Sequence, residues 1–258
     1  MTEIRPIHNS EADAFLDLLC EVFGLDSTRA RGIFFTEPLF DLSRKWALFE
    51  GREMISILTT TPLEFGWGHA FGIAGVATQS NRRGEGHASK LLNRVMAEGV
   101  HLGEPAALLF ARDPALYERN GFEPVDQVVR CPVEAIGEGE ASSLESDSIR
   151  RIYDAWASEH PDRLRRGEQR WRYWNWHYRI CSPFQSGYLC TEPGLLREAL
   201  YPDPVDALPL TPGTEWFGLT SMANQLQIPL TGDTSQSELF LMARNVPGVP
   251  QMFMTDQF

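Results

Sequence analysis

Lysine is scarce in this sequence, and positive charge is scarce with it. Only Lys45 and Lys90 are lysines among 23 basic residues, against 35 acidic residues, so the formal net charge is −12. Such a charge disfavours nucleic acid and anionic membrane surfaces as partners and favours neutral or cationic small molecules. We therefore expect a protein that binds neither nucleic acid nor membrane.

Long apolar runs and clustered metal ligands are also missing. No segment approaches the ~18 consecutive apolar residues of a membrane-spanning helix, and residues 1–5 do not begin a signal peptide. The four cysteines contain no C-x-x-C pair and the six histidines are scattered. This pattern speaks against a zinc site or a disulfide framework. These absences predict a cytoplasmic protein without a metal.

The sequence does contain enough apolar residues for a substantial core. Hydrophobic residues make up 43% of the 258 positions, which suits one large or two small domains. Strands are predicted over residues 4–7, 46–49, 54–60, 71–78 and 106–110, and helices over 10–23, 28–39, 88–96 and 114–119. This alternation predicts an α/β (α+β) domain with a mixed sheet.

A change of composition separates the two halves of the chain. Residues 136–148 consist mainly of Gly, Glu, Ser and Asp, as expected for a linker, so we place one domain at 1–137 and a second at 144–258. In the second half we expect helices over 148–159 and 167–180, a strand over 188–191, irregular structure over the proline-rich residues 193–212, and a final apolar segment over 239–244.

Arginines and aromatic residues alternate between Arg163 and Arg179, a stretch with six arginines and one acid. Such a mixture can form a stacking platform for single-stranded nucleic acid. It can also form an amphipathic helix that buries Trp171, Trp174 and Tyr178 and keeps its arginines on the solvent face. The negative net charge favours the second interpretation.

The most informative stretch is the loop that follows the predicted strand 71–78. A strand runs into a glycine-containing loop and then a helix, so free N–H groups at the helix start can face an anion. Gly84 and Gly86 allow close approach of the backbone, and Arg82 or Arg83 adds charge. Neither G-x-G-x-x-G nor G-K-[ST] is present. An ordinary strand–helix turn with solvated arginines is the alternative.

Two short motifs carry a family resemblance. Residues Arg83 to Ala88 match [QR]-x-x-G-x-[GA], and Tyr117 to Phe122 match Y-x-x-x-G-F. Together these resemble the GNAT superfamily of N-acetyltransferases, which implies a GNAT fold over the first domain. The run from Gly75 to Phe122 further resembles the enhanced-intracellular-survival type, in which a second, degenerate GNAT-like domain follows. This chain is too short for three full domains of that type, so some part is missing or much reduced, and we expect a partial second GNAT-like domain.

The resemblance implies a role for each part of the site, with acetyl-coenzyme A (acetyl-CoA) as co-substrate and no metal. The backbone of Val76, Ala77 and Thr78 would bind the pantetheine arm and the thioester carbonyl. The pyrophosphate would lie against Arg82, Arg83, Gly84, Gly86, His87 and Ala88. Tyr117 would protonate the departing thiolate, or else simply pack the helix against the sheet. Phe258 would place a C-terminal carboxylate in the active site, and the general base is otherwise unassigned.

The implied reaction is acetyl transfer from acetyl-CoA to a primary amine by direct attack in a ternary complex. The acidic composition favours a cationic small-molecule acceptor. Three alternatives stay open: a catalytically silent sensor that binds coenzyme A, a protein or peptide N-acetyltransferase, and a nucleic-acid-binding module built on the tryptophan–arginine helix. The identity of the acceptor and the formation of a homo-oligomer are also left open.

Overall fold

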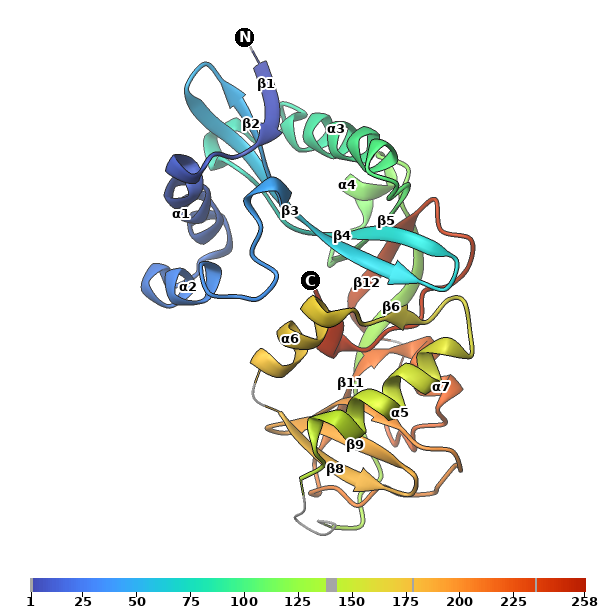
Figure 1. Cartoon of the computed structure of the whole chain (residues 1–258). Coiled ribbons are helices and arrows are strands. Elements are labelled where there is room, and N and C mark those ends of the chain that lie inside the picture. The colour runs from blue at the N-terminus through green and yellow to red at the C-terminus, as the bar shows by residue number, and fades with distance from the viewer. Residues whose placement is uncertain (1, 138–142, 178, 235) are drawn as a thin grey trace.

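The computed structural model describes residues 2–137, 143–177, 179–234 and 236–258. Its strands join into one mixed sheet in the order β1-β2-β3-β4-β5-β12-β6-β11-β10-β9-β8, with β7 paired to β3 (Figure 1). The strands are β1 (Thr2–Pro6), β2 (Lys45–Glu50), β3 (Glu53–Phe65), β4 (Gly68–Thr78), β5 (Ala106–Ala111), β6 (Glu123–Pro132), β7 (Leu164–Arg165), β8 (Ile180–Phe184), β9 (Gly187–Glu192), β10 (Leu195–Leu200), β11 (Glu215–Leu219) and β12 (Ser237–Arg244). The predicted mixed sheet is confirmed.

Helices cover both faces of this sheet. They are α1 (Ala12–Phe23), α2 (Ser27–Phe34), α3 (His87–His101), α4 (Ala115–Glu118), α5 (Ser146–Ser158), α6 (Glu168–Trp176) and α7 (Thr220–Gln225), with short 3-10 turns η1 (Asn9–Glu11), η2 (Leu42–Arg44), η3 (Ser80–Arg82) and η4 (Met254–Asp256). In the first half, α1 packs on one face through Phe15 and Leu16, and α3 packs on the other through Leu91 and Leu92. Among the described residues, no helix is long and apolar enough to cross a membrane.

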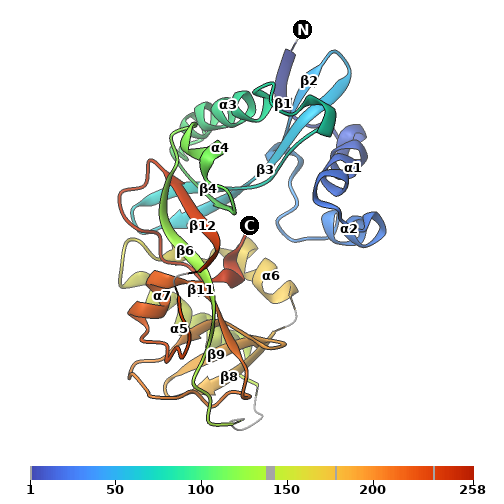
Figure 2. The same cartoon turned by 180° about the vertical axis from the view of Figure 1, so that it is seen from behind.

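The two halves of the chain share one sheet because β12 returns to the first half. Its pairing with β5 begins at Phe240 opposite Ala111, and its other edge pairs with β6. Figure 2 shows β12 and β6 running side by side between the two parts of the molecule. Of the predicted linker 136–148, residues 138–142 lie outside the described ranges and α5 already begins at Ser146. The division into domains 1–137 and 144–258 stays a prediction.

The segment of alternating arginine and aromatic residues packs inward, as the amphipathic interpretation predicts. Trp171 and Trp174 on α6 are each 4% exposed, so they cannot serve as an exposed stacking platform. The expectation that the arginines face solvent is wrong for Arg166 and Arg170, which are each 5% exposed. Buried carboxylates compensate their charge: Glu198 and Asp256 pair with Arg166, and Asp256 lies 4.0 Å from Arg170. Tyr178 lies outside the described residues.

The prediction of irregular structure over residues 193–212 is wrong in part. Strand β10 occupies Leu195–Leu200 and pairs with β9 and β11. The prolines at 193 and 202 flank this strand and none lies inside it, so every residue of the strand keeps its backbone N–H donor. The high proline content of residues 193–212 therefore concealed a short strand between two turns.

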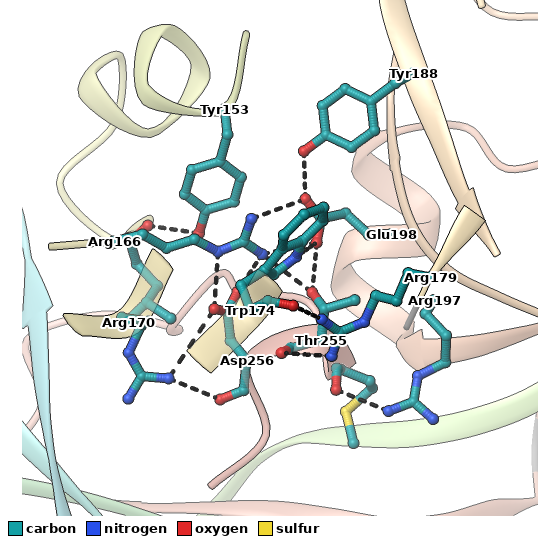
Figure 3. A network of polar contacts seen from close by, with 12 residues as sticks. Tyr153, Arg166, Arg170, Trp174, Arg179, Tyr188, Arg197, Glu198, Thr255 and Asp256 are labelled. Carbon is teal, nitrogen blue, oxygen red and sulfur yellow. Dashed lines mark hydrogen bonds and ion pairs between the residues drawn. The ribbon is translucent and has the colours of Figure 1, made fainter. Parts of the chain in front are cut away.

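A fully buried ion network joins β10, the start of α6 and the end of the chain (Figure 3). The Arg166 guanidinium donates to both carboxylate oxygens of Asp256, at 2.8 and 2.7 Å, and to both of Glu198, at 3.1 and 2.7 Å. It also lies 3.6 Å from the ring centroid of Tyr153. Charged groups this deeply buried are stable only when paired and fully hydrogen-bonded.

Further donors complete the coordination of Glu198. The hydroxyls of Tyr188 and Thr255 donate to it, and Trp174 Nε1 donates at 3.0 Å. Burial alone would raise the pKa of Glu198, but the charge of Arg166 and these hydrogen bonds hold that pKa below its ordinary value. Arg170 extends the network, because it donates to the backbone carbonyls of Asp256 at 3.2 Å and of Pro62 on β3 at 3.1 Å. Through Arg170, the last residues of the chain are thereby linked to β3 in the first half of the chain.

Replacing Arg166 tests this network. We expect Arg166→Met to lower the free energy of unfolding by about 3–5 kcal/mol, because it leaves two buried carboxylates without their cation. The neighbouring Arg165 is exposed, so Arg165→Met should stay within about 0.5 kcal/mol of the parent. Urea denaturation of both variants measures the difference. Equal losses of unfolding free energy in the two variants would show that the buried pairing of Arg166 contributes nothing specific to stability.

The pH dependence of stability gives a second readout of the same network. A depressed native pKa for Glu198 means that its stabilising contribution is present above the ordinary carboxyl pKa of ~4.3 and is lost as pH falls through the native pKa. Without its cation, the buried Glu198 of Arg166→Met has a higher native pKa than in the parent, so the stability gap between the two should narrow as pH falls toward and below about pH 4. A gap that is constant down to pH 3 would contradict the assignment.

Candidate functional site

Strand β4 parts from β5 in its second half. The parallel pairing of the two strands runs from Ala70 opposite Ala106 to Ile73 opposite Leu109 and goes no further. On its other side β4 remains paired with β3, up to Thr78 opposite Ser56. Among the described strands, none pairs with the open edge of residues 74–78. This edge offers backbone donors and acceptors to a bound molecule.

A β-bulge at Gly75 reorients the strand at this point. The register with β3 shifts between Thr59 opposite Ala74 and Ile57 opposite Ala77, so β4 carries one extra residue. Gly75 has φ +60°, and a Cβ there would lie 2.9 Å from Leu19 Cδ1. Glycine is therefore required both by the backbone conformation and by the close approach of α1.

The bulge determines toward which face of the sheet each following side chain points. Ile73 and Val76 both pack into the cluster under α3, whereas Ala77 packs into the cluster under α1. In a regular strand Val76 would point to the face opposite Ile73, since alternate residues share a face. The predicted backbone-binding residues Val76, Ala77 and Thr78 thus all lie at the bulge or just after it.

The glycine loop leads from β4 into the N-terminus of α3. Gly84 and Gly86 have φ +82° and +77°, and a Cβ added at either would meet nothing within 4 Å. The left-handed backbone, rather than packing, therefore requires glycine at both positions. No side chain of the described residues caps α3, so the N–H groups of His87 and Ala88 are open to an anion, which the helix dipole also favours.

The two arginines of this loop differ in their contacts. Arg82 donates to Glu50 at 2.8 Å and to Glu85 at 2.9 Å, so its charge is already compensated. The hydrogen bonds that the Glu85 carboxylate accepts from Arg82 and from the His87 ring lower the pKa of Glu85 to about 2. Arg83 is exposed and forms no ion pair with the described residues. It is the arginine that is available to a ligand.

The ring of His87 faces inward. It is 3% exposed, and Nε2 lies 3.0 Å from Glu85. Its Nδ1 is buried without a partner among the described residues. A contribution of His87 to ligand binding would therefore come from its backbone N–H. The acidic residue in the loop is held by Arg82 and His87 and does not stand free beside the anion position.

Tyr117 lies on the α3 face of the sheet, together with Val76. Both side chains border the same apolar cluster, and the Tyr117 ring contacts Phe122 edge-on at 6.3 Å between centroids. Burial raises the pKa of Tyr117 above its ordinary value, so its phenol keeps its proton at neutral pH. The position suits both predicted roles, packing and proton donation.

A cleft of about 550 Å³ opens on the opposite, α1 face. Its lining reaches Ala74 and Gly75 on β4, and includes Tyr173 of α6 and Phe258. The Phe258 ring presses on β4 so closely that a Cβ at Gly72 would lie 2.3 Å from it. Phe258 and Tyr117 are therefore on opposite faces of the splayed strand, and the structure does not bring them together in one pocket.

Two cleft residues were not predicted from the sequence. Lys45, 3% exposed, pairs with Glu37 at 3.3 Å, and burial lowers the pKa of Lys45. No motif contains either residue, and the only sequence signal is the rarity of lysine. Among the described residues, no group of three or more His, Cys, Asp or Glu side chains could hold a metal ion.

The comparisons with known proteins agree with this geometry. A family model for the acetyltransferase (GNAT) domain matches residues 3–125. Among solved structures, the chain is similar to a GCN5-related N-acetyltransferase from Kribbella flavida, with 16% identity, a TM-score of 0.73 and coverage of 95% of this chain and 72% of that one. A search of curated proteins found no match.

Two further structures show the same fold along this chain. A putative acetyltransferase from Pyrococcus horikoshii has 10% identity and a TM-score of 0.66, covering 97% of this chain and 91% of that one. Eis1 from Mycobacterium abscessus has 16% identity and a TM-score of 0.51, covering 75% and 51%. At these identities the matches show a shared fold. Residues 3–125, which include the splayed strand and the glycine loop, therefore match a GNAT acetyltransferase domain.

Proposed function

We propose that this protein transfers an acetyl group from acetyl-CoA to the primary amine of a small molecule, by direct attack in a ternary complex. The observation that carries the proposal is the open edge of β4 after Ile73. That edge lies between the uncapped N-terminus of α3 and the cleft that reaches Ala74 and Gly75. One end of the site therefore suits a phosphate-bearing arm, and the other suits an acceptor.

The loop residues fit the pyrophosphate of acetyl-CoA, which supplies the activated acetyl thioester. The N–H groups of His87 and Ala88 bind phosphate oxygens, and Gly84 and Gly86 keep the approach free of side chains. Arg83 adds a charge-assisted hydrogen bond. Arg82 contributes by holding Glu85 away from the anion.

The open edge of β4 and Tyr117 act on the thioester end of acetyl-CoA. Backbone groups of Ala77 and Thr78 pair with the pantetheine arm, and the Val76 N–H polarises the thioester carbonyl. Tyr117 donates its proton to the departing thiolate, which the raised pKa of the phenol permits by keeping it protonated. Phe258 lines the cleft, which supports the active-site role that the family resemblance gives to its carboxylate; that role stays a prediction.

Charge reversal in the loop tests co-substrate binding. Arg83→Glu should weaken acetyl-CoA binding by about 10-fold or more, because it removes one charge-assisted contact and adds repulsion. Isothermal titration calorimetry with acetyl-CoA measures the affinity. Arg151→Glu on α5 makes the same charge change at an exposed residue distant in the chain, and it should leave the affinity unchanged. Equal weakening in both variants would indicate a general charge effect and no pyrophosphate site.

Removing one hydroxyl tests the proton donor. Tyr117→Phe should lower kcat by ~10²-fold while leaving the KM for acetyl-CoA unchanged. Tyr201→Phe is the matched control, since Tyr201 is also half-buried with a pKa raised, to about 12, by burial. Thiol release from acetyl-CoA measures the rate. An unchanged kcat with a lower melting temperature would identify Tyr117 as a packing residue, and acetyl-CoA binding without turnover of any amine would favour a sensor.

A further inference from the structure

The cleft on the α1 face has mostly hydrocarbon walls. Helices α1 and α2, the loop between them and the segment that follows α2 contribute Leu16, Leu19, Leu25, Ile33, Phe34 and Leu39 to its lining. Leu25 and Ile33 are 47% and 43% exposed, so the apolar surface continues from the interior to the mouth. A single soluble chain rarely exposes such side chains in one place without a ligand or partner to cover them.

The charged side chains in the lining balance in sign. They are Asp26, Arg29, Glu37 and Lys45, two of each sign. Glu37 is occupied by Lys45 at 3.3 Å, whose ammonium also lies 5.0 Å from the Phe34 ring centroid. Asp26 accepts the Arg29 backbone N–H at 2.7 Å and so caps α2. The acidic character of the whole chain is therefore not concentrated in the side chains of this cleft, and a second or third ammonium group would find few carboxylates along its apolar walls.

From these walls and charges we infer that the acceptor is a monoamine with an apolar body, such as an alkylamine or an arylalkylamine, and not a polycation. This inference rests on the proposed acetyl transfer and names its substrate class. The amine would lie at Ala74 and Gly75, where the cleft meets the splayed strand, and the hydrocarbon part would lie along α1 and α2 toward Ile33. A polycation would place charges against aliphatic walls without partners, which is unfavourable.

A homologous series of amines tests the inference with the full chain. Butylamine, hexylamine, octylamine and phenylethylamine are compared with spermidine, and thiol release from acetyl-CoA gives kcat/KM for each. We expect kcat/KM to rise roughly 4-fold for each methylene until the cleft is filled, the factor that corresponds to burial of one methylene. Spermidine should be at least 10-fold poorer than hexylamine. A flat series, or a preference for spermidine, would overturn the inference.

Binding measurements separate this inference from the proposed function. Calorimetry of hexylamine and spermidine in the presence of coenzyme A reports acceptor affinity whether or not acetyl transfer occurs. If hexylamine binds more tightly than spermidine and no amine is acetylated, the cleft does take an apolar monoamine and the proposed reaction fails. If amines are acetylated but spermidine binds more tightly, the reaction holds and the assignment of the acceptor class fails.

One pair of variants locates the apolar contact. Ile33→Glu places a carboxylate at the mouth of the cleft and should lower kcat/KM for hexylamine about 10-fold, with a smaller effect for butylamine. Ile180→Glu is the matched control, because Ile180 is 50% exposed on β8 and lies outside the cleft lining. It should leave every amine unchanged. Equal effects of the two substitutions, with both melting temperatures retained, would contradict the proposed position of the hydrocarbon body.

Discussion

A buried guanidinium between two buried carboxylates holds the end of this chain in place. The side chains of Arg166 and Glu198 are fully inaccessible to solvent and that of Asp256 is 1% exposed. Removing three charged groups from water costs several kcal/mol per ion, which only close pairing and additional hydrogen bonds offset. The three residues come from three separate segments, so satisfying them fixes β10, the start of α6 and η4 relative to one another. Gln257 and Phe258 follow directly, and the Phe258 ring then reaches β4 beside Gly72.

One additional residue in β4 gives the site its two sides. The bulge at Gly75 turns Val76 toward the α3 cluster, where Tyr117 lies, and turns Ala77 toward the α1 cluster. Loss of pairing with β5 after Ile73 leaves the edge between them open. The uncapped start of α3 and the cleft on the α1 face can therefore serve the same short piece of backbone from different sides, without sharing side chains.

Charge in this protein acts locally. The chain carries a net charge of −12, yet Arg82 and Arg166 each lie between two carboxylates and Lys45 pairs with Glu37. In the glycine loop this leaves Arg83 as the exposed arginine, and in the cleft the charged side chains balance in sign. Bulk charge can steer encounters over about a Debye length of ~8 Å at physiological salt, but the lining of the cleft decides what fits.

The sequence by itself determined the parts that depend on local backbone chemistry. A glycine loop at residues 84–86 and a helix starting near Ala88 could be predicted because the backbone freedom of glycine and apolar periodicity are properties of neighbouring residues. Tyr117 was singled out by the family resemblance. Only the tertiary structure decided that β12 enters between β5 and β6, that Arg166 is buried against Asp256, 90 residues away, and that Lys45 lines the cleft. These depend on which distant segments meet. A buried and a solvated arginine look the same in a sequence, because the compensating carboxylates lie far along the chain and no local period encodes their approach.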